Sequence, residues 1–299
     1  MRDDIARLKH DLNAVVLAHN YQRPEVQDIA DFVGDSLNLS RKAMETKADI
    51  IVFCGVDFMA ETAKILNPDK KVLVPEPRAA CPMAAALSLD DLRKAQKEHP
   101  DAETVLYVNT RAEAKALCDC VCTSANAPKV VNCMDAKEII FGPDSNLGYF
   151  VSKQSKKKII NVPEYGLCPT HQQITLADVV FAREDHPGAF LLAHPECIPQ
   201  VQDLADHIAS TEGMVSFARS SKEKEFIIAT ENGLLHRLRK EAPGKKFFPA
   251  SQYTFCPNMK MTTLDKVLHV LKTQDNELLL DKRLMDRARA PIKRMLALS

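Results

Sequence analysis

Three cysteines, each followed by proline, recur along this chain at almost equal intervals. They are Cys81, Cys168 and Cys256, and the intervals between them are 87 and 88 residues. A period of this size indicates one fold unit used three times, with one thiol contributed by each copy. Three thiols brought to one point form a ligand set, so the spacing predicts a metal or cluster centre.

Three thiolates permit two kinds of centre. They can hold one zinc ion and leave its fourth position open. They can also hold a [4Fe–4S] cluster, which normally takes four cysteines, so that with three of them one iron stays free to bind water or substrate. A free iron is a Lewis acid toward a hydroxyl or carboxylate group, which suits a reaction that loses water. The proline after each cysteine constrains the backbone and withholds an N–H group.

Polar side chains end the first apolar run of each copy, with the same period as the cysteines. These residues are His19, Tyr21, Tyr107, Asn109, His194 and Glu196. A carboxylate in such a set can act as a general base, and we assign that role to Glu196. The groups that can carry protons beside it are Tyr21, Tyr107 and His19.

Hydroxyl residues follow the second apolar run of each copy. They are Ser36, Ser124 and Thr211, and a helix is expected directly after each. A hydroxyl at this position caps the helix, but the free N–H groups of a helix N-terminus also bind carboxylate or phosphate. Three such positions around one cavity suit a substrate with several anionic groups. His171, three residues after Cys168, can face either the cysteine centre or this substrate.

The repeat also predicts the elements that must position these residues. In each copy, four short apolar runs such as Ile50–Cys54 alternate with helix-length segments such as Asp57–Leu66. Buried runs of this kind are typical of parallel strands covered on both faces. We therefore predict an α/β protein of three pseudo-threefold-related domains, each a three-layer α/β/α unit with a small parallel sheet. Its polar residues would lie at the carboxyl ends of the strands, where open α/β sheets bind ligands.

The same period sets the expected domain boundaries. The repeats are residues 1–84 with Cys81, 85–171 with Cys168, and 172–257 with Cys256. Residues 258–299 fall outside the repeat. We expect two helices there, over Leu264–Lys272 and Lys282–Ala297, that pack back on the body.

The composition is that of an ordinary globular protein, with 45% hydrophobic and 27% charged residues. The 40 Lys and Arg residues balance the 40 Asp and Glu residues, so we expect a small-molecule partner and neither nucleic acid nor a membrane. No apolar run approaches the roughly 20 residues of a membrane span. The N-terminus lacks the apolar stretch of a signal peptide, so we expect a cytoplasmic protein.

Nine cysteines in a reducing compartment need an explanation other than disulfides, and their number is odd. Cys118, Cys120 and Cys122 have a spacing of two, which in a strand places them on one face, too far apart to chelate one ion easily. We expect these three to be core or near-surface thiols. The remaining cysteines, expected to be structural, are Cys54, Cys133 and Cys197.

Taken together, these residues make the chain resemble the quinolinate synthases, the NadA-type enzymes of NAD biosynthesis. The resemblance covers essentially the whole chain. Besides the three Cys-Pro sites, its most specific segments are LAHNYQ (17–22), DIADFVGDS (28–36), GVDFMAET (55–62), LYVN (106–109), TSAN (123–126), FGPDSNL (141–147) and HPE (194–196).

The resemblance implies a triangle of three domains around an oxygen-sensitive [4Fe–4S] cluster on Cys81, Cys168 and Cys256, with one iron open. It implies a transferase of pyridine nucleotide biosynthesis that condenses iminoaspartate with dihydroxyacetone phosphate into quinolinate, phosphate and water. An aspartate oxidase or dehydrogenase would supply the unstable iminoaspartate. The implied substrate-binding residues are His19, Ser36, Tyr107, Asn109, Ser124, His194, Glu196 and Thr211, and Tyr21 matches a catalytic tyrosine.

One feature departs from the family pattern. Some members carry a second cysteine close to the third cluster cysteine and can form a regulatory disulfide. Here Cys256 is followed by Pro-Asn-Met-Lys-Met, so we expect no such switch.

Two alternatives belong to other functional classes. A zinc hydrolase that uses the three cysteines would differ in metal content. A non-enzymatic anion-binding or electron-transfer protein is the second alternative. An electron carrier normally closes its cluster with four thiolates, and the repeat offers no fourth position.

Overall fold

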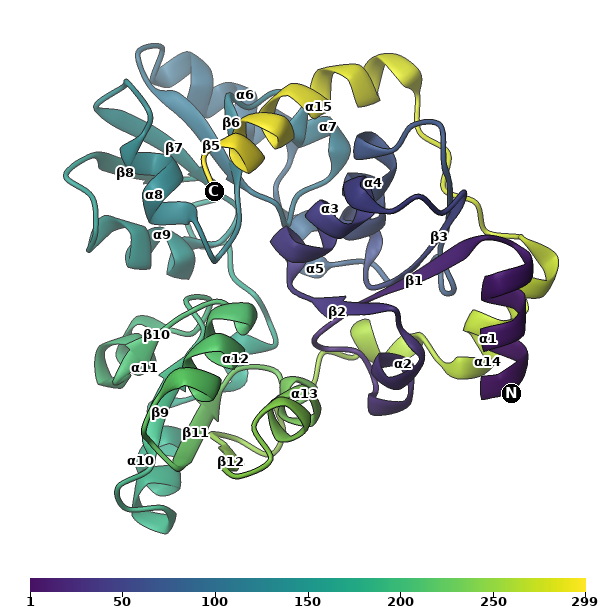
Figure 1. Ribbon diagram of the computed structural model, residues 1–299. Coiled ribbons are helices and arrows are strands. Elements are labelled where there is room, and N and C mark those ends of the chain that lie inside the picture. Colours follow the sequence, from purple (N-terminus) through teal and green to yellow (C-terminus); the bar gives the residue numbers. More distant parts are fainter.

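The computed structural model describes all 299 residues and contains three four-stranded parallel sheets (Figure 1). Their strand orders are β2-β1-β3-β4, β6-β5-β7-β8 and β10-β9-β11-β12, which is one topology used three times. Helices separate the successive strands, as parallel pairing requires. The predicted α/β class with three small parallel sheets is confirmed.

Each sheet and its crossover helices occupy a continuous segment of the chain. The first contains β1 (Ala14–His19), α2 (Pro24–Ile29), β2 (Phe32–Gly34), α3 (Ser36–Glu45), β3 (Ile50–Cys54), α4 (Asp57–Leu66) and β4 (Lys71–Leu73). The second contains β5 (Glu103–Tyr107), α7 (Ala112–Lys115), β6 (Cys120–Cys122), α8 (Ala127–Asn132), β7 (Glu138–Gly142), α9 (Ser145–Ser152) and β8 (Lys158–Asn161). The third contains β9 (Phe190–Ala193), α11 (Pro199–Leu204), β10 (His207–Ile208), α12 (Thr211–Ser220), β11 (Glu225–Ala229), α13 (Leu234–Glu241) and β12 (Lys246–Pro249).

Other helices precede the repeats or connect them. They are α1 (Arg2–Asp11), α5 (Pro82–Ala86), α6 (Leu89–Glu98) and α10 (Leu176–Asp185), with 3₁₀ turns at His171–Gln173 and Met259–Met261. The boundaries at 84/85, 171/172 and 257/258 remain predictions.

The central strands explain why the sequence shows continuous apolar runs. All five residues of β3 are buried, and Leu17 of β1 pairs with Phe53 of β3 in the parallel register. The edge strands β2, β6 and β10 have only two or three residues each. Short edges of this kind limit unwanted pairing with other chains.

An aspartate precedes each of the edge strands β2, β6 and β10 and hydrogen-bonds to the strand beside it. Each carboxylate accepts a backbone N–H from the first strand of its own sheet. The pairs are Asp31 with Val16 (2.8 Å), Asp119 with Thr104 (2.7 Å) and Asp206 with Leu191 (2.7 Å). These aspartates recur at intervals of 88 and 87 residues, which is a further sign of the triplication.

In each repeat, one buried side chain of the first crossover helix contacts a neighbouring repeat. Gln27 of α2 donates to a carbonyl group of the third repeat, and Gln202 of α11 donates to the Asn146 carbonyl of the second repeat (3.0 Å each). The equivalent residue of α7 is Lys115, whose buried ammonium group lies 5.4 Å from the centroid of the Phe58 ring in the first repeat. These contacts close a ring of three repeats, so the carboxyl ends of their sheets face one centre (Figure 1).

The residues after the third repeat return across the first two. Helix α14 (Leu264–Thr273) packs on α1 and β3, and α15 (Lys282–Ala297) crosses β6, α7 and α4 (Figure 1). None of the helices combines the length and the apolar character needed to cross a lipid bilayer.

Candidate active site

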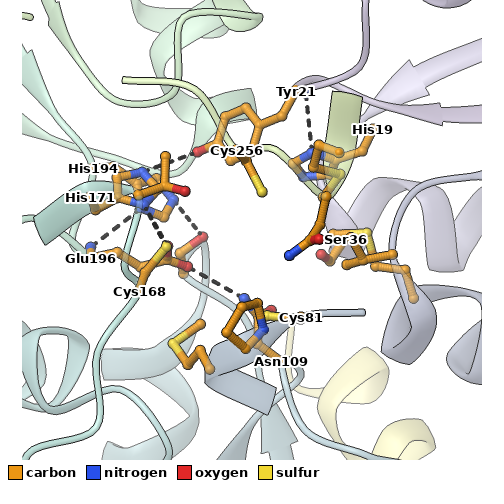
Figure 2. A pocket seen from close by; sticks show the side chains of 18 of the residues that line it. His19, Tyr21, Ser36, Cys81, Asn109, Cys168, His171, His194, Glu196 and Cys256 are labelled. Carbon is orange, nitrogen blue, oxygen red and sulfur yellow. Dashed lines mark hydrogen bonds and ion pairs between the residues drawn. The ribbon is translucent and has the colours of Figure 1, made fainter. Parts of the chain in front are cut away.

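The carboxyl ends of the three sheets surround one cavity (Figure 2). All the predicted site residues line it. They are His19, Tyr21, Ser36, Cys81, Tyr107, Asn109, Ser124, Cys168, His171, His194, Glu196, Thr211 and Cys256. They come from all three repeats, so the site forms only when the repeats are assembled. No lysine or arginine lines the cavity.

The three Cys-Pro cysteines share one local structure. The carbonyl oxygen of each accepts the N–H of the residue four positions on, at 3.0 Å for Cys81 and Cys168 and 3.2 Å for Cys256. The proline therefore occupies the first position of a helical turn, where its missing N–H costs nothing. The backbone N–H three residues on faces the sulfur in each case and acts to lower the pKa of the thiol, although burial outweighs it. All three sulfurs thus lie at the start of a helical turn and line the cavity (Figure 2).

The environment of these thiols fits a three-thiolate cofactor site. Five of the nine free cysteines are buried and Cys133 is exposed, whereas these three are partly exposed at the cavity. Burial raises the pKa of the Cys81 thiol to about 12 and also raises the pKa of Cys168 and Cys256. Thiols in such surroundings ionise when a metal centre provides the positive charge. Cysteines 118, 120 and 122 lie in or beside β6, away from the cavity wall.

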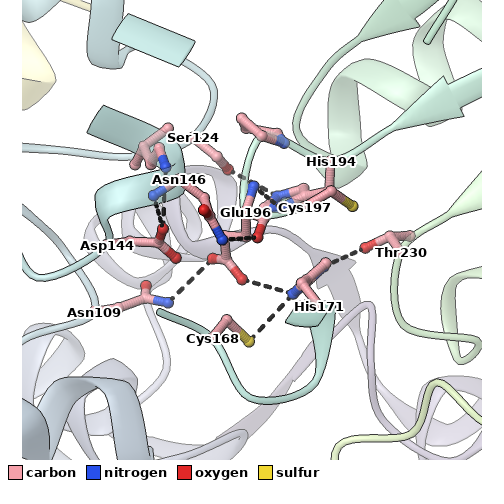
Figure 3. Close-up of polar contacts among 12 residues, drawn as sticks. Asn109, Ser124, Asp144, Asn146, Cys168, His171, His194, Glu196, Cys197 and Thr230 are labelled. Carbon is pink, nitrogen blue, oxygen red and sulfur yellow. Dashed lines mark hydrogen bonds and ion pairs between the residues drawn. The ribbon is translucent and has the colours of Figure 1, made fainter. Parts of the chain in front are cut away.

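Glu196 is the centre of a buried hydrogen-bond network (Figure 3). Its Oε1 accepts the Tyr107 hydroxyl at 2.5 Å, and its Oε2 lies 2.8 Å from Nδ1 of His171. Asn109 Nδ2 approaches Oε1 at 3.5 Å. Burial raises the pKa of Glu196, but the nearby His171 and the hydrogen bonds from His171 and Tyr107 outweigh it, so the pKa lies below its ordinary value. Glu196 is therefore a carboxylate that can accept a proton.

Tyr21 joins this network from the first repeat. Its hydroxyl lies 2.6 Å from Thr230 Oγ1 and 3.4 Å from His171 Nε2, and Thr230 Oγ1 lies 2.8 Å from the same nitrogen. Burial, followed by the charge of Glu196, raises the pKa of Tyr21 and of Tyr107 well above 10. Both hydroxyls thus remain protonated at neutral pH and can donate.

Sequence reasoning missed Thr230. The repeat-related positions hold Val56 and Pro143, neither of which has a hydroxyl group. No periodic signal therefore marks this residue, and only its contact with Tyr21 and His171 reveals it.

His19 and His194 occupy related positions and have the same geometry. The Nδ1 atom of each accepts the backbone N–H two residues on, at 3.2 and 3.3 Å. That bond leaves the ring proton on Nε2, and in His194 this atom lies 3.2 Å from Ser124 Oγ. Burial lowers the pKa of both histidines to about 3, so both are neutral donors.

These neutral histidines predict that the apoprotein loses stability in mild acid. An unfolded histidine titrates near pH 6.5, but these two stay neutral in the folded protein down to about pH 3. In that window the unfolded state binds more protons, so acid favours unfolding by about 1 kcal/mol per histidine between pH 7 and pH 5.5. Urea unfolding at the two pH values measures the loss. It should be smaller in the double variant His19→Gln/His194→Gln, and an equal loss in both proteins would contradict the prediction.

The predicted hydroxyl residues line the cavity, but their interpretation as helix caps was wrong. Asp35 and Ser210, one residue earlier, cap α3 and α12 by accepting the N–H three residues on, at 2.9 and 3.2 Å. Ser36 and Thr211 are therefore the first residues of their helices. Ser124 lies in the turn before α8. The capping role belongs to a neighbour. The three hydroxyl residues line the cavity instead, and Thr211 Oγ1 also accepts the Asn20 Nδ2 group at 2.8 Å.

Two asparagines of the second repeat act near Glu196: one hydrogen-bonds to its backbone, and the other has a buried oxygen without a hydrogen-bond partner. Asn146 Nδ2, which sequence reasoning missed, donates to the Glu196 carbonyl at 3.1 Å (Figure 3). The Oδ1 atom of Asn109 is buried and has no hydrogen-bond partner. Because a buried acceptor without a partner is costly, this oxygen is positioned to accept an N–H or O–H group from a substrate.

A second set of possible metal ligands lies at one corner of the cavity. One ligand atom each from Cys168, His171 and Glu196 lie within 4.8 Å of one another, a spacing that can hold a single ion. His171 Nδ1 is 3.2 Å from the sulfur and 2.8 Å from the carboxylate. This set differs from the three-cysteine zinc site of the sequence analysis, and metal content tests both.

A ring of three α/β repeats around a three-cysteine site with proton-transfer groups defines a cofactor-dependent enzyme. The sequence comparisons agree: residues 3–297 match the family described as quinolinate synthetase A protein (NadA), and the chain belongs to that family. The proteins it resembles include the quinolinate synthases of Thermodesulfovibrio yellowstonii (51% identity; 99% of this chain and 97% of the relative) and Pyrococcus horikoshii (51%; 99% and 98%). A third is the quinolinate synthase of Methanosarcina barkeri (53%; 98% and 96%). The resemblance stated from the sequence is confirmed.

Proposed function

We propose that this chain condenses iminoaspartate with dihydroxyacetone phosphate to form quinolinate, phosphate and water. The observation that carries the proposal is the convergence of three Cys-Pro cysteines on the cavity that also holds the Tyr107–Glu196–His171 network. Family membership and relatives named quinolinate synthase support the same activity.

The residues that would hold the cofactor are Cys81, Cys168 and Cys256. When bound, a [4Fe–4S] cluster with three protein ligands supplies an open iron, a Lewis acid for a hydroxyl or carboxylate oxygen. The fit is supported by the shared turn structure of the three cysteines and by the N–H group that faces each sulfur. Hydrogen bonds to sulfur are a normal part of the surroundings of such clusters.

Substrate anions would be bound without lysine or arginine. Iminoaspartate has two carboxylates and its partner a phosphate, yet no cationic side chain of those types lines the cavity. The positive ends of α3 and α12 begin at Ser36 and Thr211 on the cavity wall. With the Ser124 hydroxyl, which lies 3.2 Å from His194 Nε2, and the Nε2–H group of His19, they provide several donors for anionic oxygens.

Proton transfer would centre on Glu196. Forming an aromatic ring requires protons to leave carbon and to reach departing hydroxyl groups. The Glu196 carboxylate can take the first, and the protonated Tyr107 hydroxyl at 2.5 Å can return one. Tyr21 and His171 extend the path to Thr230, and Asn109 Oδ1 would orient an N–H or O–H of the substrate.

Two features of the cellular setting follow from the same proposal. An imine of aspartate hydrolyses readily, so an aspartate oxidase or dehydrogenase would supply it directly. Nine cysteines without a disulfide favour a reducing compartment, in keeping with a cytoplasmic enzyme.

Metal content and product formation test the proposal together. The protein is purified without oxygen, iron and acid-labile sulfide are measured per chain, and quinolinate is assayed with freshly generated iminoaspartate. We expect about four irons and four sulfides, as a cubane cluster requires, together with quinolinate formation. One zinc and no sulfide would overturn the cofactor and favour the zinc alternative.

A further inference from the structure

A carboxylate follows the third strand of every repeat. The three residues are Asp57 after β3, Asp144 after β7 and Glu231 after β11, separated by 87 residues each time. None of them lines the cavity, so any effect they have on it must act through the residues that do. Their period matches that of the Cys-Pro sites, so each repeat has one such carboxylate and one such cysteine.

Two of these carboxylates bind the backbone of a Cys-Pro cysteine. Asp57 Oδ1 accepts the N–H of Cys81 at 2.9 Å and the N–H of Phe58 at 2.9 Å. Glu231 Oε1 accepts the N–H of Cys256 at 3.1 Å. Because the next residue is proline, the cysteine N–H is the last backbone donor before the turn that presents the sulfur. A carboxylate on that donor fixes where the turn begins.

Glu231 has a second connection that Asp57 lacks. Its Oε1 also lies 2.8 Å from Lys260 Nζ, and its Oε2 accepts the N–H of Gly233 at 2.7 Å. Lys260 in turn donates to the carbonyl of Tyr21. The Cys256 turn is thereby linked to the segment that carries Tyr21.

The third carboxylate differs. Asp144 Oδ1 accepts the N–H groups of Asn146 and Leu147 at 2.9 and 3.0 Å, and Oδ2 is buried without a partner (Figure 3). Cys168 is instead contacted by His171 Nδ1 at 3.2 Å. The positioning role therefore applies to two of the three cysteines.

We propose that Asp57 and Glu231 are positioning residues of the cofactor site, which hold the backbone of Cys81 and Cys256 so that both sulfurs face the cavity. The inference rests on the cofactor part of the proposed function. Partners behind metal ligands orient those ligands, and their loss commonly weakens metal binding about 10- to 100-fold.

The two carboxylates respond differently to removal of their charge alone. Asp57 uses a single oxygen for both of its N–H donors, so the amide oxygen of Asp57→Asn can replace it. Glu231 uses both oxygens, so the NH₂ group of Glu231→Gln must face a donor whichever way the amide is turned. The inference thus predicts that the first variant holds the cofactor as firmly as the wild type and that the second holds it more weakly.

The test compares these two variants with Asp57→Ala, the wild type and a matched control. Asp119→Ala is the control, because Asp119 is also a carboxylate that accepts a backbone N–H (2.7 Å), but it does not line the cavity. Each protein is loaded with iron and sulfide without oxygen, and iron release to a chelator is followed by absorbance. Urea unfolding of each apoprotein measures general stability.

We expect Asp57→Ala and Glu231→Gln to release iron about 10-fold faster than the wild type. Asp57→Asn and Asp119→Ala should release it at the wild-type rate. Equal rates in all proteins, or equal acceleration in the Asp119→Ala control, would overturn the inference. If Asp57→Ala does not fold, the contrast between Asp57→Asn and Glu231→Gln decides the question. A wild type that binds no iron or sulfide would instead refute the proposed cofactor.

Discussion

Replacement of Cys81 by serine is expected to abolish quinolinate formation. Cys81 supplies one of only three thiols that face the cavity from Cys-Pro turns. Serine has nearly the same size, but its hydroxyl group ionises far less readily and is a poor ligand for iron in a cluster, which prefers soft thiolates. Two remaining thiolates would leave a second iron without a protein ligand. Activity should fall to that of a blank without enzyme, and iron and sulfide per chain should fall with it.

Cys133→Ser is the matched control for this prediction. Cys133 is exposed and lies outside the cavity wall, so the same chemical change there should leave iron content and activity unchanged. Both variants are purified without oxygen and assayed for iron, sulfide and quinolinate. Full activity in Cys81→Ser would refute the assignment of the cofactor to this cysteine. Iron loss in both variants would show that the measurement does not report on the site.

Glu196→Gln is expected to lower kcat by about 10²- to 10⁴-fold, the usual contribution of a general base. Glutamine fills the same space but cannot take up a proton. Its NH₂ group would also face either the Tyr107 hydroxyl or His171 Nδ1, both of which now contact a carboxylate oxygen at 2.5 and 2.8 Å. The loss should appear mainly in kcat, because the three cysteines and the anion-binding hydroxyl groups remain in place.

The control for this variant is Glu225→Gln at the start of β11. That carboxylate pairs only with Lys246 (2.8 Å) at the far end of the strand from the cavity. Steady-state kinetics of both variants, with iron content measured beside them, separate chemistry from cofactor loss. A Glu196→Gln enzyme with full iron and unchanged kcat would exclude Glu196 as the base.

The triplication and the edge where the site lies could be predicted from the sequence because both are local and periodic. Apolar runs report burial along a single strand, and a polar residue after such a run lies at a strand end whatever the rest of the chain does. Cys81, Cys168 and Cys256 stand out for the same reason, since one local turn occurs three times. Asp57 and Glu231 carry the same period and could have been found by it.

Only the tertiary structure decided which side chains contact one another. Tyr21 and Thr230 are 209 residues apart in sequence, and their hydroxyl groups meet at 2.6 Å because the first and third repeats pack together. The unusual protonation states likewise depend on assembly. His19 is neutral because it is buried, and Glu196 stays ionised because His171 and Tyr107 hydrogen-bond to it. Desolvation and hydrogen bonding act through space, so a linear pattern can name the candidate groups but cannot assign their charge or their partners.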